Sequence, residues 1–301
     1  MLSHRHDIFF EVARELSFTK ASQSLYISQS AISKHVKALE EHYKVGLFER
    51  HGNTVSLTPA GKLLYQKLLK ARQLQHELYE DFKSVSASFN PQQRMVIGSS
   101  TTISLYVLPP LLSKYLEQNP NVQIILKNRN SENILKALLE HEIDLGVSEG
   151  LTKVSNVSYT PFITDEIIGV CSSQSPLAGK TLQLKDLYNL PLALREHGSG
   201  TLESLGDALS RKNIKLNDLP VKIRLGGTEA LKNFVRADTC LSFLPKPAVR
   251  KELETGELVE VPVSGLHIKR SFYFMQRKGT ENDVLHKKFI SFVKKQYSKT
   301  E

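Results

Sequence analysis

The sequence predicts an α/β protein built from three zones of different secondary structure. Residues 1–57 show short helical periods followed by two short β-prone runs, and residues 58–88 carry one long helical period. From Arg94 onward, apolar strands alternate with helices, which predicts a mainly parallel sheet with right-handed crossovers. A polar stretch containing Pro91 separates the last two zones and is typical of a linker.

Composition narrows the class of protein without naming a partner. The chain has 301 residues, of which 40% are hydrophobic and 24% charged, as in ordinary globular proteins. No apolar run reaches the ~20 residues of a membrane span, and the polar N-terminus is unlike a signal peptide. Cys171 and Cys240 lack the spacing of a metal site, so we expect a reduced, cytoplasmic protein without metal or cofactor.

The net charge of +9 is compatible with a polyanionic partner but does not establish one. Residues 1–90 contain 12 lysines and arginines against 9 acidic residues, whereas the stretch from Lys269 contains 9 against 3. We interpret that basic C-terminal stretch as a solvated helix face. Nucleic-acid binding must therefore be inferred from patterned residues and not from bulk charge.

The first zone has the pattern of a winged helix-turn-helix. Its expected elements are a helix over 8–16, a helix over 20–26 begun by Ser17 or Thr19, a turn at Ile27-Ser28, a helix over 29–42, and a hairpin with strands 47–50 and 54–57. Gly52 and Asn53 between those strands tolerate the positive φ that a tight hairpin needs.

The helix over 29–42 has two different faces. Ile32, Val36, Leu39 and Tyr43 lie on one side and are expected to pack inward. The other side carries no carboxylate, as entry into a groove lined by phosphates requires, and comprises Gln29, Ser30, Ser33, Lys34 and Lys37. The alternative is an ordinary solvated surface, because short helical motifs often match by chance.

The second zone begins at Thr58-Pro59, a good N-cap followed by a residue suited to the first helical position. A narrow apolar stripe follows, consisting of Leu64, Leu68, Ala71, Leu78, Phe82 and Val85. This stripe predicts pairing with the same helix of a second chain, or alternatively packing against its own domain.

Several motifs at fixed spacing resemble the LysR-type transcriptional regulators. They are Phe18-Thr19-Lys20-Ala21-Ser22, Leu25, residues 27–33, Leu39-Glu40, residues 46–50 and residues 57–61. The resemblance implies promoter DNA and RNA polymerase as partners, a homodimer or homotetramer, and a small-molecule inducer that modulates transcription. It places DNA contacts at Thr19, Gln29, Ser30, Ser33, Lys34, Lys37 and Arg50. Gln29 is suited to an adenine edge, Lys34 to guanine or phosphate, and Lys37 and Arg50 to phosphate.

The resemblance also implies an effector domain similar to type 2 periplasmic binding proteins. The expected domains are 1–58 for DNA binding, 59–93 for the linker helix, and 94–301 for the effector, with one lobe at 94–163 plus 268–301 and the other at 164–267. Two crossings between the lobes would form a hinge that closes over a ligand.

Polar residues follow three expected strands of that domain. Ser99–Thr102 follow the first strand, Glu149 ends the third, and residues 195–201 follow a strand of the second lobe. Ligands of open α/β sheets bind at such strand ends, so the expected effector contacts are Ser100, Thr101, Thr102, Glu149, Arg195, Glu196, Ser199 and Thr201. The alternatives are a helix-capping turn at 99–102 and a flexible loop at 195–201. Hydroxyls and Arg195 favour a polar or anionic ligand, whereas the two glutamates oppose a strongly anionic one.

Two rival functions remain open. An enzyme could use Glu149, Arg195, Glu196 and His197, although we find no nucleophile elbow, phosphate loop, dinucleotide fingerprint or metal cluster. A redox switch could use the two cysteines, which we interpret instead as core residues. Departures from the family at Ser104, Asp238 and Cys240, where relatives often carry glycine, leave the inducer open.

Overall fold

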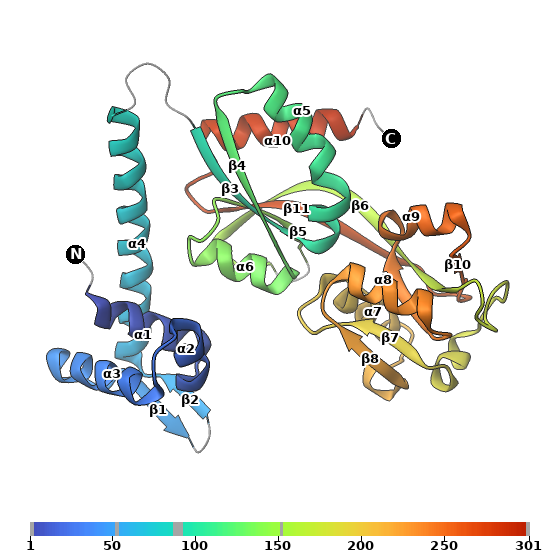
Figure 1. Cartoon of the computed structure of the whole chain (residues 1–301), viewed down its shortest axis with the longest axis horizontal. Coiled ribbons are helices and arrows are strands. Elements are labelled where there is room, and N and C mark those ends of the chain that lie inside the picture. Colours follow the sequence, from blue (N-terminus) through green and yellow to red (C-terminus); the bar gives the residue numbers. More distant parts are fainter. Residues whose placement is uncertain (1–2, 52–53, 87–92, 151–152, 299–301) are drawn as a thin grey trace. The chain divides into compact units, whose positions relative to one another are not determined.

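The computed structural model describes residues 3–51, 54–86, 93–150 and 153–298, which fall into two compact units (Figure 1). The N-terminal unit comprises residues 1–91 and the C-terminal unit residues 92–301. Each has its own clusters of buried apolar side chains, so each is described by itself below.

The N-terminal unit confirms the predicted order of helices and hairpin. Its elements are α1 (His4–Glu15), α2 (Phe18–Leu25), α3 (Gln29–Tyr43), β1 (Phe48–His51), β2 (Thr54–Leu57) and α4 (Pro59–Ser86). Helix α2 begins at Phe18 and not at Lys20, because Ser17 is its N-cap and accepts a hydrogen bond from the Lys20 amide. Gly52 and Asn53 of the expected hairpin tip lie outside the described residues.

The prediction of which α3 residues pack inward is confirmed except for the last one. Ile32, Val36 and Leu39 are buried against α1 and β1 neighbours. Tyr43 is 42% exposed, so the prediction that it packs inward is wrong. Its hydroxyl instead lies 2.8 Å from Nε2 of His6 at the start of α1. A phenol keeps its oxygen near water or a polar partner, which the core does not offer here.

The apolar stripe of α4 is buried in the core of the N-terminal unit at its start and exposed farther along. The Thr58 hydroxyl caps the helix by accepting from the Gly61 amide and donating to the Gly46 carbonyl, as the Thr58-Pro59 pattern predicts. Leu68 is buried and Leu64 half-buried within the unit's own core. Leu78 and Phe82, farther along, are 54% and 66% exposed. The first part of the stripe therefore packs on its own domain, and the side chain of Val85 lies outside the described residues.

Within its described residues, the C-terminal unit contains a nine-stranded sheet in the order β4-β3-β5-β11-β6-β9-β7-β8, with β10 paired to β6. One half contains β3 (Gln93–Ser100), the π-helix η1 (Ile103–Val107), α5 (Leu108–Gln118), β4 (Val122–Arg129), α6 (Ser131–Leu139), β5 (Leu145–Glu149) and α10 (Val284–Tyr297). The other contains η2 (Leu184–Asn189), β7 (Leu192–Arg195), α7 (Gly200–Ser210), η3 (Leu216–Asp218), β8 (Val221–Leu225), α8 (Thr228–Ala237), β9 (Leu241–Pro245), α9 (Lys246–Thr255) and β10 (Leu258–Glu260).

Two long antiparallel strands, β6 (Val157–Ser172) and β11 (Ile268–Arg277), join the two halves. Helices cover both faces of the sheet in each half (Figure 1). In β3, Met95 and Ile97 face the α5 and α10 side, while Val96 faces α6, as strand alternation requires. The pairs β3–β4, β3–β5, β7–β8 and β7–β9 are parallel, in agreement with the predicted crossovers.

The alternative of a helix-capping turn at residues 99–102 is not what the structure contains. Ser99 and Ser100 are the last residues of β3, and helical backbone begins at Thr101 and continues through η1 into α5. Ser104, at the first turn of this helix, donates to the Ser99 carbonyl at 3.1 Å and lies 2.5 Å from the Ser99 hydroxyl. These bonds keep the strand end and the helix start together, so no separate turn forms.

Gly61 is a position where the N-terminal unit tolerates no side chain. A Cβ there would lie 2.1 Å from the backbone oxygen of Leu47, which cannot move as a flexible side chain could. We expect Gly61→Ala to destabilise the N-terminal unit by about 3 kcal/mol through overpacking. Urea unfolding with hydrogen exchange over residues 3–51 measures this. Gly46→Ala, which meets no atom within 4 Å, is the control; equal effects of the two variants would contradict the prediction.

Candidate functional site

The side chains predicted to contact DNA are mostly exposed on the N-terminal unit. Gln29, Ser30, Lys34 and Lys37 of α3 and Thr19 of α2 are exposed, while Ser33 is half-buried. Ser28 caps α3 by accepting from the Ala31 amide at 3.2 Å, which orients the first turn. Arg50 belongs to β1, but the placement of its side chain is not described.

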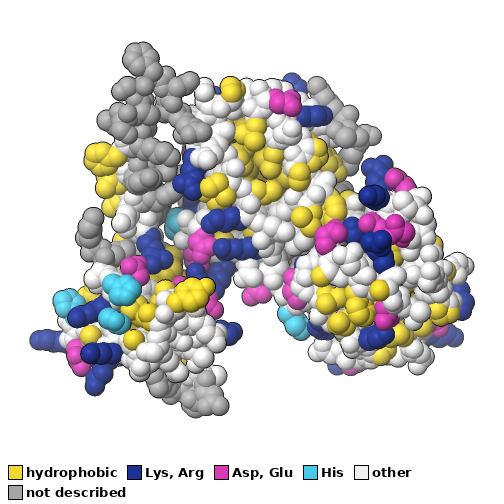
Figure 2. All heavy atoms as spheres, in the orientation of Figure 1, with side chains coloured by type: hydrophobic (Ala, Val, Ile, Leu, Met, Phe, Trp, Pro, Cys, Tyr) yellow, Lys and Arg dark blue, Asp and Glu magenta, His cyan; other side chains and the backbone are white. Residues whose placement is uncertain are grey.

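Glu40, the first acidic residue of α3, forms hydrogen bonds that hold the start of β1. Glu40 Oε1 accepts hydrogen bonds from the amides of Leu47 and Phe48, at 2.7 and 3.3 Å. Its charge is therefore engaged with the start of β1. On the face shown in Figure 2, Lys and Arg side chains are spread over both units, so the absence of acids from the first turns of α3 distinguishes this surface better than bulk charge.

A small cavity lies where the two halves of the C-terminal unit meet. Its volume is about 10 Å³, room for about one water molecule. It is lined by Ser100, Thr101, Thr102, Asn130, Ser131, Glu149, Arg195, Ser199, Gly200 and Thr201. Seven of the eight predicted effector contacts are among them, and Glu196 is not. Ser100 Oγ is buried here without a hydrogen-bond partner among the described residues.

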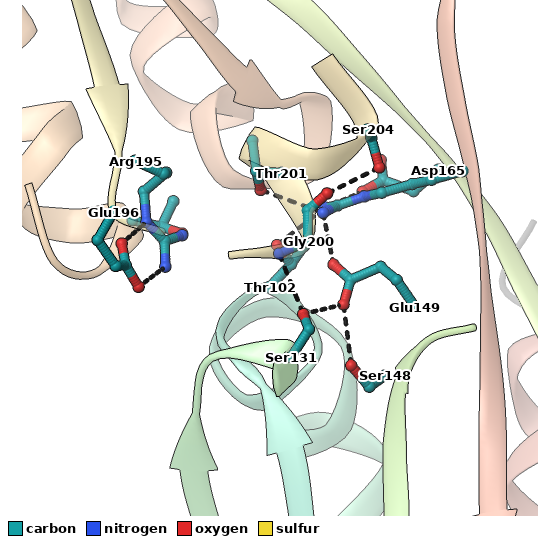
Figure 3. A network of polar contacts seen from close by, with 12 residues as sticks. Thr102, Ser131, Ser148, Glu149, Asp165, Arg195, Glu196, Gly200, Thr201 and Ser204 are labelled. Atoms are coloured by element: carbon teal, nitrogen blue, oxygen red, sulfur yellow. Dashed lines mark hydrogen bonds and ion pairs between the residues drawn. The ribbon is translucent and has the colours of Figure 1, made fainter. Parts of the chain in front are cut away.

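Beside this cavity lies Arg270 of β11, which the sequence analysis did not select. Its guanidinium donates from Nη1 to Glu149 Oε1 at 2.6 Å and to Thr201 Oγ1 at 3.1 Å. Nη2 donates to Thr102 Oγ1 at 2.9 Å and to Asp165 Oδ2 at 2.7 Å, and Nε reaches the same carboxylate at 3.2 Å. Arg270 and both acidic side chains are at most 3% exposed. Figure 3 shows the labelled partners converging from both halves.

Glu149 extends this network to α6 and α7. Its Oε2 accepts from the hydroxyls of Ser131 and Ser148 at 2.5 and 3.0 Å. The Ser131 hydroxyl in turn accepts from the Gly200 amide at 3.2 Å, at the N-terminus of α7. Gly200 is required here because a Cβ would lie 2.4 Å from the Glu149 carboxyl carbon. One carboxylate thus ties β5 to a helix of each half.

Asp165 is the second carboxylate that pairs with Arg270. Burial raises the pKa of its carboxyl above the ordinary value, although the guanidinium beside it acts in the opposite direction. With Glu149 and Asp165 facing one guanidinium, the network holds two acids for one base. The positive charge of the Arg270 guanidinium is therefore already paired with protein carboxylates.

Arg195 and Glu196 form a separate pair. Arg195 Nε and Nη2 donate to the two carboxylate oxygens of Glu196 at 2.7 and 2.9 Å, and Nη1 donates to Thr228 Oγ1 at 2.6 Å. Burial alone would raise the pKa of Glu196, but Arg195 holds it below its ordinary value. Figure 3 shows this pair apart from Glu149 and Asp165. Arg195 lines the cavity, but its charge is already paired.

One signal in the sequence could have identified Arg270. Ile268, Arg270, Phe272 and Phe274 alternate along β11 and all are buried. A charged residue at an inward position of an alternating strand is rare unless it is paired, so it indicates buried acidic partners. Which acids these are could not be read from the strand itself.

The described residues offer little support for the rival chemistries. Both cysteines are buried and unpaired, and burial raises the pKa of both thiols, that of Cys240 to about 12. Such thiols carry little of the reactive thiolate. Within the described ranges no three acidic, histidine or cysteine side chains could together hold a metal ion, and no described helix could cross a membrane.

Comparisons with known proteins agree with this organisation. Residues 4–62 match the bacterial regulatory helix-turn-helix protein model of the lysR family, and residues 90–298 match the LysR substrate binding domain model. The HTH-type transcriptional regulator CysL of Bacillus subtilis (strain 168) is 30% identical over 292 residues, which cover 96% of this chain and 95% of that protein.

Solved structures share the fold. Full-length CbnR complexed with its target DNA is 19% identical, with a TM-score of 0.59 over 98% of this chain and 99% of that one. The Synechocystis PCC6803 CcmR regulatory domain in complex with 2-PG is 24% identical, with a TM-score of 0.62 over 68% of this chain and 97% of that one. The chain therefore belongs to the LysR family of transcriptional regulators, with an N-terminal DNA-binding helix-turn-helix and a C-terminal substrate-binding domain.

Proposed function

We propose that this regulator binds promoter DNA through the acid-free face of α3 and responds to a small polar ligand in the cavity between the halves of its C-terminal unit. The observation that carries the proposal is the convergence of Ser100, Thr102, Glu149 and Thr201 on one buried site. These side chains come from segments far apart in the chain, and packing alone does not require them to be polar.

In this proposal, Gln29 and Lys34 read base edges, while Lys37 and Arg50 contact phosphates and position the helix. Thr19, Ser30 and Ser33 complete the contact surface. A bidentate base contact contributes about 1–3 kcal/mol of discrimination, whereas a phosphate contact contributes affinity without sequence preference. The exposure of Gln29 and Lys34 on the first turns of α3 supports this division of roles.

The ligand must exchange places with contacts that now fill the cavity, since only about 10 Å³ is open. Thr102 precedes η1 and Thr201 belongs to α7, and both accept from Arg270. Separation of the halves therefore breaks bonds to this residue, and a polar ligand can replace them. Arg195 and Arg270 are already paired with acids, so an anionic group on the ligand must compete with Glu196, Glu149 or Asp165 for its cation.

The proposal further assigns α4 to dimerisation, with a tetramer as the larger assembly. Leu74, Leu78 and Phe82 expose 65%, 54% and 66% of their surface, which pairing with a second α4 would bury.

RNA polymerase is the proposed protein partner and the cytoplasm the proposed compartment. Catalysis has no part in this function, because Glu149, Arg195 and Glu196 are engaged in structural ion pairs.

Substitution on α3 tests the DNA-reading face. We expect Gln29→Ala and Lys34→Ala to weaken binding to a duplex selected by the wild-type protein at least tenfold, because base contacts are lost. Binding is measured by titration at fixed salt. The control is Lys212→Ala, which removes an equally exposed charge from the other unit. Equal affinity of all variants would refute the assigned face.

Ser100→Ala tests the ligand site without disturbing the fold. The buried Ser100 hydroxyl has no described partner, so its loss should leave the melting temperature unchanged or raise it. A metabolite that stabilises the wild-type chain in a thermal-shift screen should bind this variant up to tenfold more weakly. Ser204→Ala removes a hydroxyl that donates to the Gly200 carbonyl within α7 and is the control. A normal ligand response from Ser100→Ala would place the site elsewhere.

Arg270→Met tests the buried ionic network. Glu149 and Asp165 would lose the buried guanidinium that pairs with both of them, so we expect urea unfolding to show a loss of about 3–5 kcal/mol in the C-terminal unit. Adding Glu149→Gln and Asp165→Asn removes the uncompensated charge and should restore most of that loss. Lys222→Met breaks the Lys222–Asp238 pair at the surface and should leave the free energy of unfolding nearly unchanged. A triple variant as unstable as Arg270→Met would contradict this account.

A further inference from the structure

Tyr26 stands out in the N-terminal unit because its side chain contributes nothing visible to the fold. It is 95% exposed, the highest value among the large apolar and aromatic side chains of the described residues. No hydrogen bond, ring contact or ion pair joins its side chain to the described part of the chain. Large aromatic side chains are usually well buried, so full exposure is an observation that needs a reason.

The backbone conformation at Tyr26 is also unusual for a residue with a side chain. The residue ends α2 in the left-handed conformation, with φ 54° and ψ 36°. Residues with a Cβ adopt this conformation at a cost, and glycine is typical at the end of a helix. Leu16 ends α1 in the same conformation but buries about half of its side chain. At Tyr26 neither the backbone nor the packing of the unit favours a large aromatic residue.

The position of Tyr26 in the helix-turn-helix indicates a role in DNA binding. It directly precedes the turn that leads through Ser28, the N-cap, into Gln29 and the polar face of α3. No Asp or Glu occurs between Glu15 and Glu40, so the whole segment around Tyr26 lacks negative charge. In a helix-turn-helix the helix before the recognition helix crosses the DNA backbone, and Tyr26 lies at the end of that helix, next to the turn into α3.

We propose that Tyr26 contacts the DNA backbone, with its phenol O–H donating to a phosphate oxygen beside the groove that α3 enters. The proposal rests on DNA binding by α3 as described above, and adds a contact outside that helix. A phosphate occurs at every nucleotide, so this contact strengthens binding to any duplex equally. Because the phenol is uncharged, it displaces no counterion and leaves the salt dependence of binding unchanged.

Tyr26→Phe removes only the hydroxyl and tests the contact in the full-length protein. The probes are a duplex selected from a random library by the wild-type protein and a scrambled duplex of equal length. We expect Tyr26→Phe to bind both about tenfold more weakly, the loss typical of one hydrogen bond to a charged group, with the salt slope unchanged. Lys37→Ala should instead reduce the slope by about one.

Tyr26→Gly separates the effect of Tyr26 on folding stability from its effect on DNA affinity. Relief of the left-handed backbone should raise the melting temperature, while affinity for both duplexes falls at least as far as in Tyr26→Phe. Leu16→Gly is the matched control, because it relieves the same conformation at the end of α1. It should leave affinity unchanged, which shows that a change at a left-handed helix end does not by itself weaken binding.

Three outcomes would overturn the proposal. Wild-type affinity of Tyr26→Phe and Tyr26→Gly for both duplexes excludes a DNA contact. A loss confined to the selected duplex indicates a base contact. Intact DNA binding with reduced transcription by purified polymerase assigns Tyr26 to a protein partner. Failure of the wild-type protein to select any duplex would instead refute DNA binding by α3, and is distinguished from the other results because Tyr26 is unchanged in it.

Discussion

The C-terminal unit is organised around one buried guanidinium. Arg270 lies on β11, one of the two strands common to both halves, and its partners come from β5, β6, α7 and the segment before η1. A buried charge without partners would cost several kcal/mol, so these segments must converge on it for the unit to fold. The network therefore couples the arrangement of the halves to one site, which is also the site where we propose that a ligand binds.

Acidic side chains in both units are likewise held by hydrogen bonds or ion pairs to other protein groups. Glu149 is held by Arg270 and two hydroxyls, and Glu196 is held by Arg195. In the N-terminal unit, Glu40 near the end of α3 is bonded to the backbone at the start of β1, and the first turns of α3 contain no acidic residue. Glu149 thus lines the cavity of the C-terminal unit, whereas no acidic residue lies on the face of α3 that we propose to bind DNA.

Helix α4 shows how one helix can serve two environments. Its first turns are fixed by the Thr58 cap and by Leu68 in the core of the N-terminal unit. Farther along, Leu74, Leu78 and Phe82 are each more than half exposed. A periodic stripe in the sequence is the same in both cases, because periodicity reports which face is apolar and not what covers that face.

Local features were determined by the sequence itself. Ser28 and Thr58 as caps, the inward Ile32 and Val36, and the alternation of strands and helices all depend on residues within a few positions of one another. Tertiary structure decided the rest. Arg270 meets Glu149, 121 positions away, and Thr102, 168 positions away, and no local pattern encodes such distances. The outward position of Tyr43 was likewise decided by the folded chain, which places its hydroxyl beside His6, 37 positions away, because hydrogen bonds and burial depend on neighbours that are distant in the sequence.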